Sequence, residues 1–192
     1  MKTLQLLNAK DISSITTPKD YTPVNLYSSS SLVLTDFNEQ LPLTIDSTSC
    51  ATEVEHLMKK EHVRLKLVVG EGNEFLGTIT LKELNEQEIV KKVAGGFSRD
   101  EFRVSEFMTP KSNIAVLDVD DLKETNLKEL IVSLADYDEQ HILVVEHESK
   151  ELIGLVSCSD IIRKLKLPLR VDDNNSFKDV YRILSKSNLI KH

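Results

Sequence analysis

The sequence predicts a mixed α+β protein made of two tandem β-α-β-β-α units that pack sheet to sheet about a pseudo-twofold axis. The first observation is an internal repeat, because Ile45–Leu84 aligns without a gap on Leu122–Ile161. The second is that apolar spacing alternates between helical and strand-like periods in the same order within each copy. One such unit of ~60 residues buries too little surface to be stable alone, so a shared core gives a physical reason for the duplication.

The repeat preserves the character of paired positions more than their identity. Apolar residues fall on apolar residues, and hydroxyls and carboxylates also coincide. The identical pairs are Thr48/Thr125, Leu57/Leu134, Val68/Val145, Glu71/Glu148, Glu74/Glu151 and Gly77/Gly154. The conservative pairs include Val54/Ile131, Leu65/Ile142, Thr80/Ser157 and Glu83/Asp160.

The first copy contains one complete set of elements, each with its own local signal. Helix caps, β-branched runs and glycine turns mark the boundaries. In chain order we expect an entering strand at Val33–Phe37, a helix from Ser47–Ser49 to about Glu61, a strand at Val63–Val69, a turn at Gly70–Asn73, a strand at Phe75–Ile79 and a helix at Leu81–Ala94 that ends at Gly95-Gly96.

The second copy repeats that order after a connector at Ser98–Lys111. The predicted elements are a helix marked by Leu127, Leu130, Ile131 and Leu134, strands at Ile142–Val145 and Leu152–Val156, a helix at Asp160–Leu165 before Pro168, and one more short helix at Ser176–Ser185. The predicted organisation is an irregular N-terminal arm at 1–32, a first domain at 33–97, a second domain at 98–166 and a C-terminal tail at 167–192.

Composition narrows the class of protein. The net charge is −7, and an acidic surface argues against nucleic-acid binding by bulk electrostatics. No apolar run approaches the roughly 20 residues of a membrane span, and the start lacks the pattern of a secretory signal.

The two cysteines, Cys50 and Cys158, stand at non-equivalent repeat positions, so we expect no disulfide and a cytoplasmic location. Cys158 is interpreted as a packing residue.

The junction after the last strand of each copy carries the sharpest candidate chemistry. Thr80 precedes Glu83 by three residues, and Ser157 precedes Asp160 in the same way. One interpretation is structural, because a hydroxyl followed by a carboxylate at this spacing is a helix capping box. The other is functional, because a helix N-terminus with a hydroxyl binds phosphate and a nearby carboxylate accepts hydrogen bonds from a ribose diol. The preceding glycines, Gly77 and Gly154, would leave space beside the strand.

Several motifs together resemble a pair of CBS domains, the Bateman module named from cystathionine β-synthase. Phe107–Pro110 (Phe-Met-Thr-Pro) resembles the motif that opens a CBS domain. Arg64–Val68 and His141–Val145 resemble the family's core strand, with Lys66 and Leu143 where the family has proline. The glycine strands and the two hydroxyl-carboxylate motifs follow in the family's order. The resemblance covers about residues 33–166 and indicates a stand-alone, bacterial-type CBS-pair protein.

The resemblance implies that adenosine ligands bind in clefts between the two units. Asp160 would hold the ribose and Ser157 the phosphate, while Glu83 replaces aspartate beside Thr80, so we expect one competent site. Carried over from the family, the remaining candidates are Arg64 and His141 for phosphate and Ile45 and Leu122 for adenine. Residue chemistry leaves alternatives open: Arg64 and Lys66 should share one strand face that is merely solvated, and His141 has the alternative of a hydrogen-bonded core histidine.

The predicted function is a regulatory sensor that changes its packing when a ligand binds. The expected ligands are AMP, ADP, ATP, NAD or S-adenosylmethionine, with no required cofactor, no metal and no enzyme activity. We expect a homodimer that signals to an effector protein not identifiable from the sequence. The alternative is a CBS-pair scaffold that mediates protein interactions without a ligand. A small hydrolase is the third hypothesis, and it lacks a set of nucleophile, base and orienting group.

Overall fold

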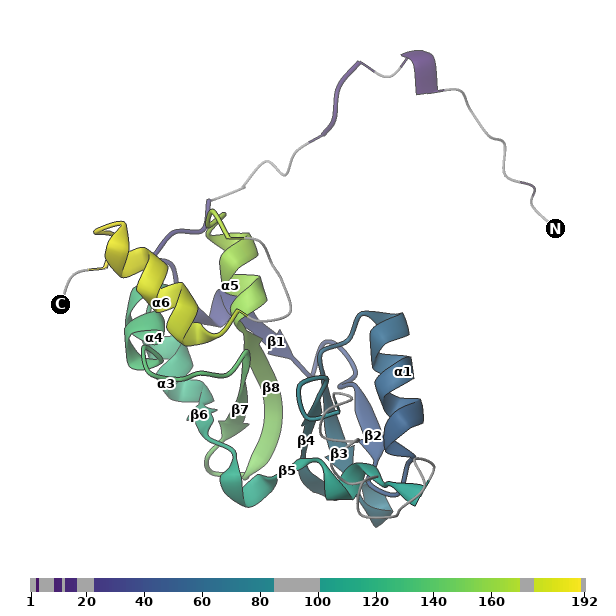
Figure 1. The fold of residues 1–192 in the computed structure, drawn as a ribbon. Helices are drawn as coiled ribbons and strands as arrows, with labels where there is room; N and C mark the ends of the chain where they lie inside the picture. The colour runs from purple at the N-terminus through teal and green to yellow at the C-terminus, as the bar shows by residue number, and fades with distance from the viewer. Residues whose placement is uncertain are drawn as a thin grey trace.

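The protein contains two four-stranded sheets that lie side by side, with helices on their outer sides (Figure 1). This arrangement is seen in a computed structural model that describes residues 3, 9–11, 13–16, 23–84, 101–169 and 175–190. The first sheet has the order β2-β3-β4-β5 and the second has the order β1-β8-β7-β6. The predicted mixed α/β class with two related units is therefore confirmed.

The strands and helices lie close to the predicted positions. The strands are β1 (Leu34–Asp36), β2 (Thr44–Asp46), β3 (Leu65–Val69), β4 (Phe75–Thr80), β5 (Thr109–Pro110), β6 (Val116–Asp118), β7 (His141–Glu146) and β8 (Glu151–Ser157). The helices are α1 (Ala51–Glu61), α3 (Val119–Glu124), α4 (Leu127–Ser133), α5 (Cys158–Lys164) and α6 (Phe177–Lys186). The helix predicted at Leu81–Ala94 lies mostly outside the described residues, with only a turn at its start.

Each sheet takes its edge strand from the segment that precedes the other unit in the chain. β1 comes before the first unit, yet it pairs antiparallel with β8 of the second. β5 comes before the second unit, yet it pairs antiparallel with β4 of the first. The sheets therefore do not follow the sequence ranges 33–97 and 98–166, because one edge strand from each range lies in the other sheet.

The stretches of chain that lead into β1 and β5, together with these strands, are called the exchanged segments. The two repeated glycines provide the space for them. Gly77 lies opposite Pro110 of β5, and Gly154 lies opposite Asp36 of β1. A Cβ atom at Gly154 would stand 2.5 Å from the carbonyl oxygen of Thr35, and one at Gly77 would overlap that of Thr109. The space that we expected beside these strands is therefore filled by backbone of the exchanged segment.

The exchanged segments also satisfy backbone groups at helix starts. The N–H of Ala51 at the start of α1 donates to the carbonyl of Phe102 at 2.9 Å. In the second unit the N–H of Leu127 at the start of α4 donates to the carbonyl of Ser28, also at 2.9 Å. Because the first N–H groups of a helix have no partner inside it, these bonds tie each exchanged segment to the unit that it joins. Leu26, within the predicted arm 1–32, packs against the second core.

Strand pairing corrects the gapless alignment of the repeat. Val68 pairs with Gly77 in the first unit, and Val144 pairs with Gly154 in the second. The turn of the second hairpin is one residue longer, so the alignment is right at the glycines and wrong by one residue before them. Leu57 illustrates the error, since it is 37% exposed, whereas Leu134 is buried.

The pairing of Ile45 with Leu122 is also wrong. Ile45 lies on β2 beside Val68, and the residue in the equivalent place of β6 is Leu117, which lies beside Val144. Leu122 lies in helix α3 and is only 2% exposed within the second core. The gapless alignment missed this because the second unit has the additional short helix α3 between β6 and α4, whereas only a turn separates β2 from α1 in the first unit.

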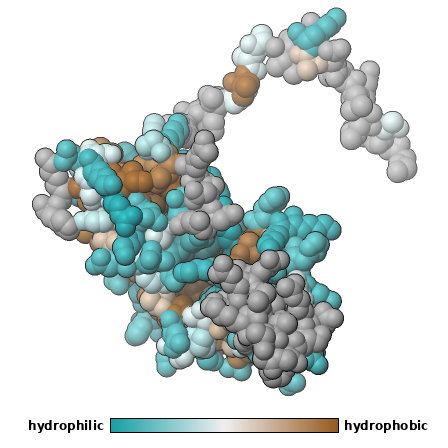
Figure 2. Space-filling view, viewed as in Figure 1, coloured by the Kyte–Doolittle hydropathy of each residue, from teal (hydrophilic) through white to brown (hydrophobic). Residues whose placement is uncertain are grey.

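Among the residues that the structure describes, the second unit has the larger apolar core. Its core includes α4, α5 and three buried residues of α6: Phe177, Val180 and Leu184. The first core is built around α1, β3 and β4, and it also receives Phe102 and Val104 of the exchanged segment. The visible surface is mostly hydrophilic, with apolar residues gathered over the end formed by α5 and α6 (Figure 2). None of the helices described has the length and apolar character to cross a membrane.

Candidate ligand cleft between the two units

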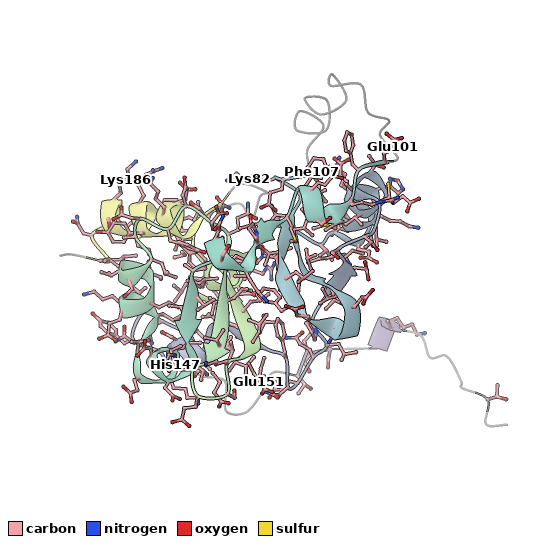
Figure 3. All side chains as sticks on the ribbon, turned by 90° about the horizontal axis from the view of Figure 1, so that it is seen from below. Lys82, Glu101, Phe107, His147, Glu151 and Lys186 are labelled. Carbon is pink, nitrogen blue, oxygen red and sulfur yellow. The ribbon has the colours of Figure 1, made fainter. Side chains whose placement is uncertain are left out.

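A cleft with a volume of about 790 Å³ lies between the two units. Residues of β3, β4 and the turn after β4 form one side, and the connector from Glu106 to Ala115 contributes a second part. The opposite side is lined by residues 137–141, Leu143 and Ser176. Two lining residues, Lys82 and Phe107, are labelled on the same side of the molecule in Figure 3.

Four of the predicted site residues line this cleft. They are Arg64, Thr80, Glu83 and His141. The other four predicted residues are not among its lining residues: Ser157, Asp160, Ile45 and Leu122. The cleft thus combines the hydroxyl-carboxylate motif of the first unit with the start of β7 from the second.

The Glu83 carboxylate accepts hydrogen bonds from hydroxyl and amide donors. Its Oε2 accepts from the N–H of Thr80 at 2.7 Å and from the Thr80 hydroxyl at 3.1 Å. Its Oε1 accepts from the hydroxyl of Thr109 on the exchanged strand β5. The carboxylate reaches back as in a capping box, but the Thr80 hydroxyl donates to it and does not cap the turn. This geometry favours the structural interpretation of the motif in the first unit.

The motif of the second unit has a different geometry. Ser157 is the N-cap of α5, and its hydroxyl accepts from the N–H of Ser159 at 3.1 Å. Asp160 does not complete a capping box, because its Oδ1 pairs with Arg163 at 2.8 Å. Its side chain is 30% exposed. Because the ion pair uses only one oxygen of this partly exposed carboxylate, Asp160 keeps the capacity to accept further hydrogen bonds.

His141 is a largely buried residue at the start of β7, in register with Ser157. Burial, together with the nearby positive charge of Arg64, lowers the pKa of the imidazole to about 4. The ring is therefore neutral at pH 7 and has one N–H donor and one acceptor nitrogen. A neutral imidazole can donate one hydrogen bond to a ligand but adds no positive charge to the cleft.

Arg64 and Lys66, expected on one solvated strand face, have different surroundings. Arg64 directly precedes strand β3 and lines the cleft. Lys66 is only 6% exposed and pairs with Glu61 at 3.3 Å. Arg64 is thus the member of this pair that can meet a ligand.

Sequence reasoning missed residues 137–140, called here the cleft wall, and it also missed Ser176, which lines the cleft beside them. No motif marks Tyr137 or Asp138, which simply precede strand β7. Ser176 does carry a signal, because Ser176 and Asp179 form a capping box at the start of α6. That signal predicts where a helix begins, but it does not reveal which part of the fold the helix start contacts.

The two cysteines are expected to differ strongly in reactivity. The Cys158 thiol is buried and donates to the carbonyl of Asn175, and burial raises its pKa to about 12. Cys50 is half-buried, and a hydrogen bond with Thr52 lowers its pKa.

Because the thiolate is the reactive species, iodoacetamide at pH 8 should label Cys50 at least about tenfold faster than Cys158 in the native protein. Peptide mass spectrometry measures the two rates, and unfolded protein serves as the control in which they become similar. Equal rates in the native protein would contradict the structure.

Comparisons with known proteins identify the overall fold, and they assign one part of the chain to a family. Residues 104–167 match the CBS domain family. No curated protein sequence matches the chain significantly. An uncharacterised conserved protein from Pyrococcus horikoshii is similar in structure, with a TM-score of 0.53 and 18% identity over 78% of this chain and 100% of that one.

Two further solved structures have the same fold. CBSX2 in complex with AMP, a protein of Arabidopsis thaliana, has a TM-score of 0.51 and 17% identity over 71% of this chain and 94% of that one. A CBS-domain containing protein from Agrobacterium tumefaciens has a TM-score of 0.50 and 20% identity over 67% of this chain and 88% of that one. Residues 104–167 of the present chain are therefore a CBS domain, and the chain as a whole has the fold of these solved CBS-domain structures.

Proposed function

We propose that this protein is a non-catalytic regulatory module that reversibly binds an adenine nucleotide or adenosyl compound between its two units. The observation that carries this proposal is the cleft of about 790 Å³ lined by both units. Small-molecule sites in proteins have volumes of roughly 300–1,000 Å³, so the cleft is large enough for a nucleotide. A ligand that contacts both units favours one relative placement of them, and it therefore shifts the population toward that placement.

The lining residues offer groups for each part of such a ligand. Arg64 and Lys82 are cations in the cleft, and a guanidinium forms strong paired hydrogen bonds with phosphate. Leu65, Ile114 and the ring of Tyr137 supply apolar surface suited to a purine. The AMP complex of CBSX2 supports an adenosine ligand for this fold. We further propose that the signal passes to an effector protein or through a homodimer.

The Ser157 and Asp160 position is the second candidate within the same function. Asp160 retains a partly exposed carboxylate suited to a ribose diol, whereas Glu83 is held by Thr80 and Thr109. The residues that line the cleft do not include Ser157 or Asp160. We propose that the ligand binds in the cleft, because every binding mode requires a cavity large enough to hold the ligand.

A scaffold without a ligand is the alternative function, and one observation favours it. Both motifs have structural partners, because Glu83 is bonded within its own unit and Ser157 caps α5. If these roles are the whole purpose of the motifs, the conserved topology serves only to hold two units together for a partner protein.

Calorimetry and thermal shift with AMP, ADP, ATP, NAD and S-adenosylmethionine, with and without Mg²⁺, test the proposal. At 100 times its Kd a ligand stabilises the native state by about 2.7 kcal/mol, which corresponds to a rise of several degrees in Tm. Arg64→Ala should weaken binding at least about tenfold, because a charge-assisted hydrogen bond to phosphate is lost. The matched control is Lys123→Ala, which removes an exposed cation of α3 outside the cleft.

The variants also locate the ligand. A loss of binding in Asp160→Ala with little change in Arg64→Ala would place it at the second position. A flat response of the wild-type protein to the whole panel would refute the sensor and leave the scaffold.

A further inference from the structure

Helix α6 lies beyond residues 104–167, the part of the chain that matches the CBS domain family, yet its N-cap residue Ser176 lines the cleft. We propose that Ser176 and the start of α6 are a positioning element that holds the cleft wall at residues 137–140 in place. This inference concerns the same cleft as the proposed function, but the positioning role does not depend on the identity of the ligand.

Three hydrogen bonds join the start of α6 to the wall. The Ser176 hydroxyl lies 3.0 Å from Oδ1 of Asp138. The N–H of Phe177 donates to the carbonyl of Glu139, and the N–H of Lys178 donates to the carbonyl of Tyr137, both at 3.1 Å. The three acceptor residues all line the cleft. The wall thus satisfies two N–H groups of the first helical turn, those of Phe177 and Lys178.

The Ser176 hydroxyl serves two carboxylates at once. It lies 3.0 Å from Oδ2 of Asp179 as well as from Asp138, and it also accepts from the N–H of Asp179 at 3.4 Å. Ser176 is only 3% exposed, so these partners replace water at a buried position. Since one hydroxyl proton is shared between two carboxylates, the contact depends on the exact placement of α6 relative to Asp138.

Apolar packing makes the helix a firm support for the wall. The Phe177 side chain is fully buried, and its ring centroid lies 6.1 Å from that of Tyr137. Val180 and Leu184 continue this face into the second core. A shift of residues 137–140 would therefore have to break the contacts of α6 or carry the helix with it.

The same cluster extends to the junction of β8 and α5. The N–H of Cys158 donates to the carbonyl of Gln140 at 2.9 Å, and its thiol donates to the carbonyl of Asn175. Cys158 directly follows Ser157, so the cluster connects the cleft wall with the second candidate position. The amide of Cys158 is consequently a reporter of wall position that belongs neither to the wall nor to α6.

Amide hydrogen exchange in the ligand-free, full-length protein tests the positioning role. Ser176→Ala should speed exchange at the Cys158 amide by about fivefold or more, because the wall that accepts its bond is no longer held. Ser176→Thr, which keeps the hydroxyl, should restore exchange to within about twofold of wild type. Asn126→Ala is the matched control, since Asn126 caps α4 with an equivalent capping box away from the cleft.

The outcomes separate a positioning role from a simple helix cap. Loss of a cap alone would speed exchange only within α6, and unchanged exchange at Cys158 in Ser176→Ala would overturn the proposal. Acceleration at Cys158 by Asn126→Ala to the same extent would also overturn it, because the effect would then be global. The affinity for AMP, measured by titration, is a second test. Ser176→Ala should weaken AMP binding about fivefold, and Ser176→Thr should restore it. If AMP and the wider panel fail to bind wild type, the proposed function fails, while the exchange result still decides the role of Ser176.

Discussion

Replacing Gly154 by alanine is expected to destabilise the protein by about 1–3 kcal/mol, the usual cost of forcing an extra methyl group into a packed site. The new Cβ would stand 2.5 Å from the carbonyl oxygen of Thr35 and 2.8 Å from Cδ1 of Leu34. The first of these neighbours is backbone of β1, which cannot yield by a side-chain rotation. We therefore expect the exchanged strand to move away from β8.

Thermal unfolding measures this effect. For a chain of this size, 1 kcal/mol corresponds to about 2–4 °C, so Tm should fall by about 3–10 °C. Gly70→Ala is the matched control, because its Cβ would meet only the flexible end of Leu76 at 3.0 Å. A Gly154→Ala protein as stable as wild type would contradict the close approach of β1 to β8.

Acid is expected to destabilise the protein through His141. The imidazole has a pKa of about 4 in the folded protein, against 6.5 for the ordinary group. Above pH 6.5 the ring is neutral in both states, and this contribution to stability is fully present. Between pH 6.5 and 4 the unfolded chain binds the proton first, so the free energy of unfolding falls as pH falls. One pKa unit corresponds to 1.36 kcal/mol, which gives a loss of up to about 3 kcal/mol.

Urea unfolding at pH 7.0 and pH 4.5 measures this loss. The decrease should be about 2–3 kcal/mol smaller in His141→Gln than in wild type, because glutamine does not titrate. His147→Gln is the control, since His147 is exposed beyond the end of β7 (Figure 3). If His141→Gln and wild type lose the same stability on acidification, the ring is not buried as a neutral group.

The sequence was most informative about local structure. The predicted strands at Val33–Phe37, Val63–Val69 and Phe75–Ile79 coincide closely with β1, β3 and β4. Local patterns suffice there because alternation, β-branched side chains and turn glycines act over a few residues. The motif at Thr80 and Glu83 was also predicted in position, and the structure places it in the cleft.

The fine register of the repeat could not be predicted from the sequence. A gapless alignment treats both hairpin turns as equal in length, whereas the second turn holds one residue more. Side-chain chemistry alone gives no signal for this shift, because runs such as Leu67–Val69 and Ile142–Val145 remain apolar in either register. Only the pairing of Val68 with Gly77 and of Val144 with Gly154 decides it.

By itself, the sequence determined that two copies of one α/β unit would form the protein and where most of their elements lie. The tertiary structure decided that β1 and β5 exchange sheets, that Glu83 is bonded to Thr109, and that Ser176 reaches the cleft. These features join residues far apart in the chain. They are stabilised by close packing and by hydrogen bonds that form only when the two units come together. Local sequence patterns therefore do not predict them.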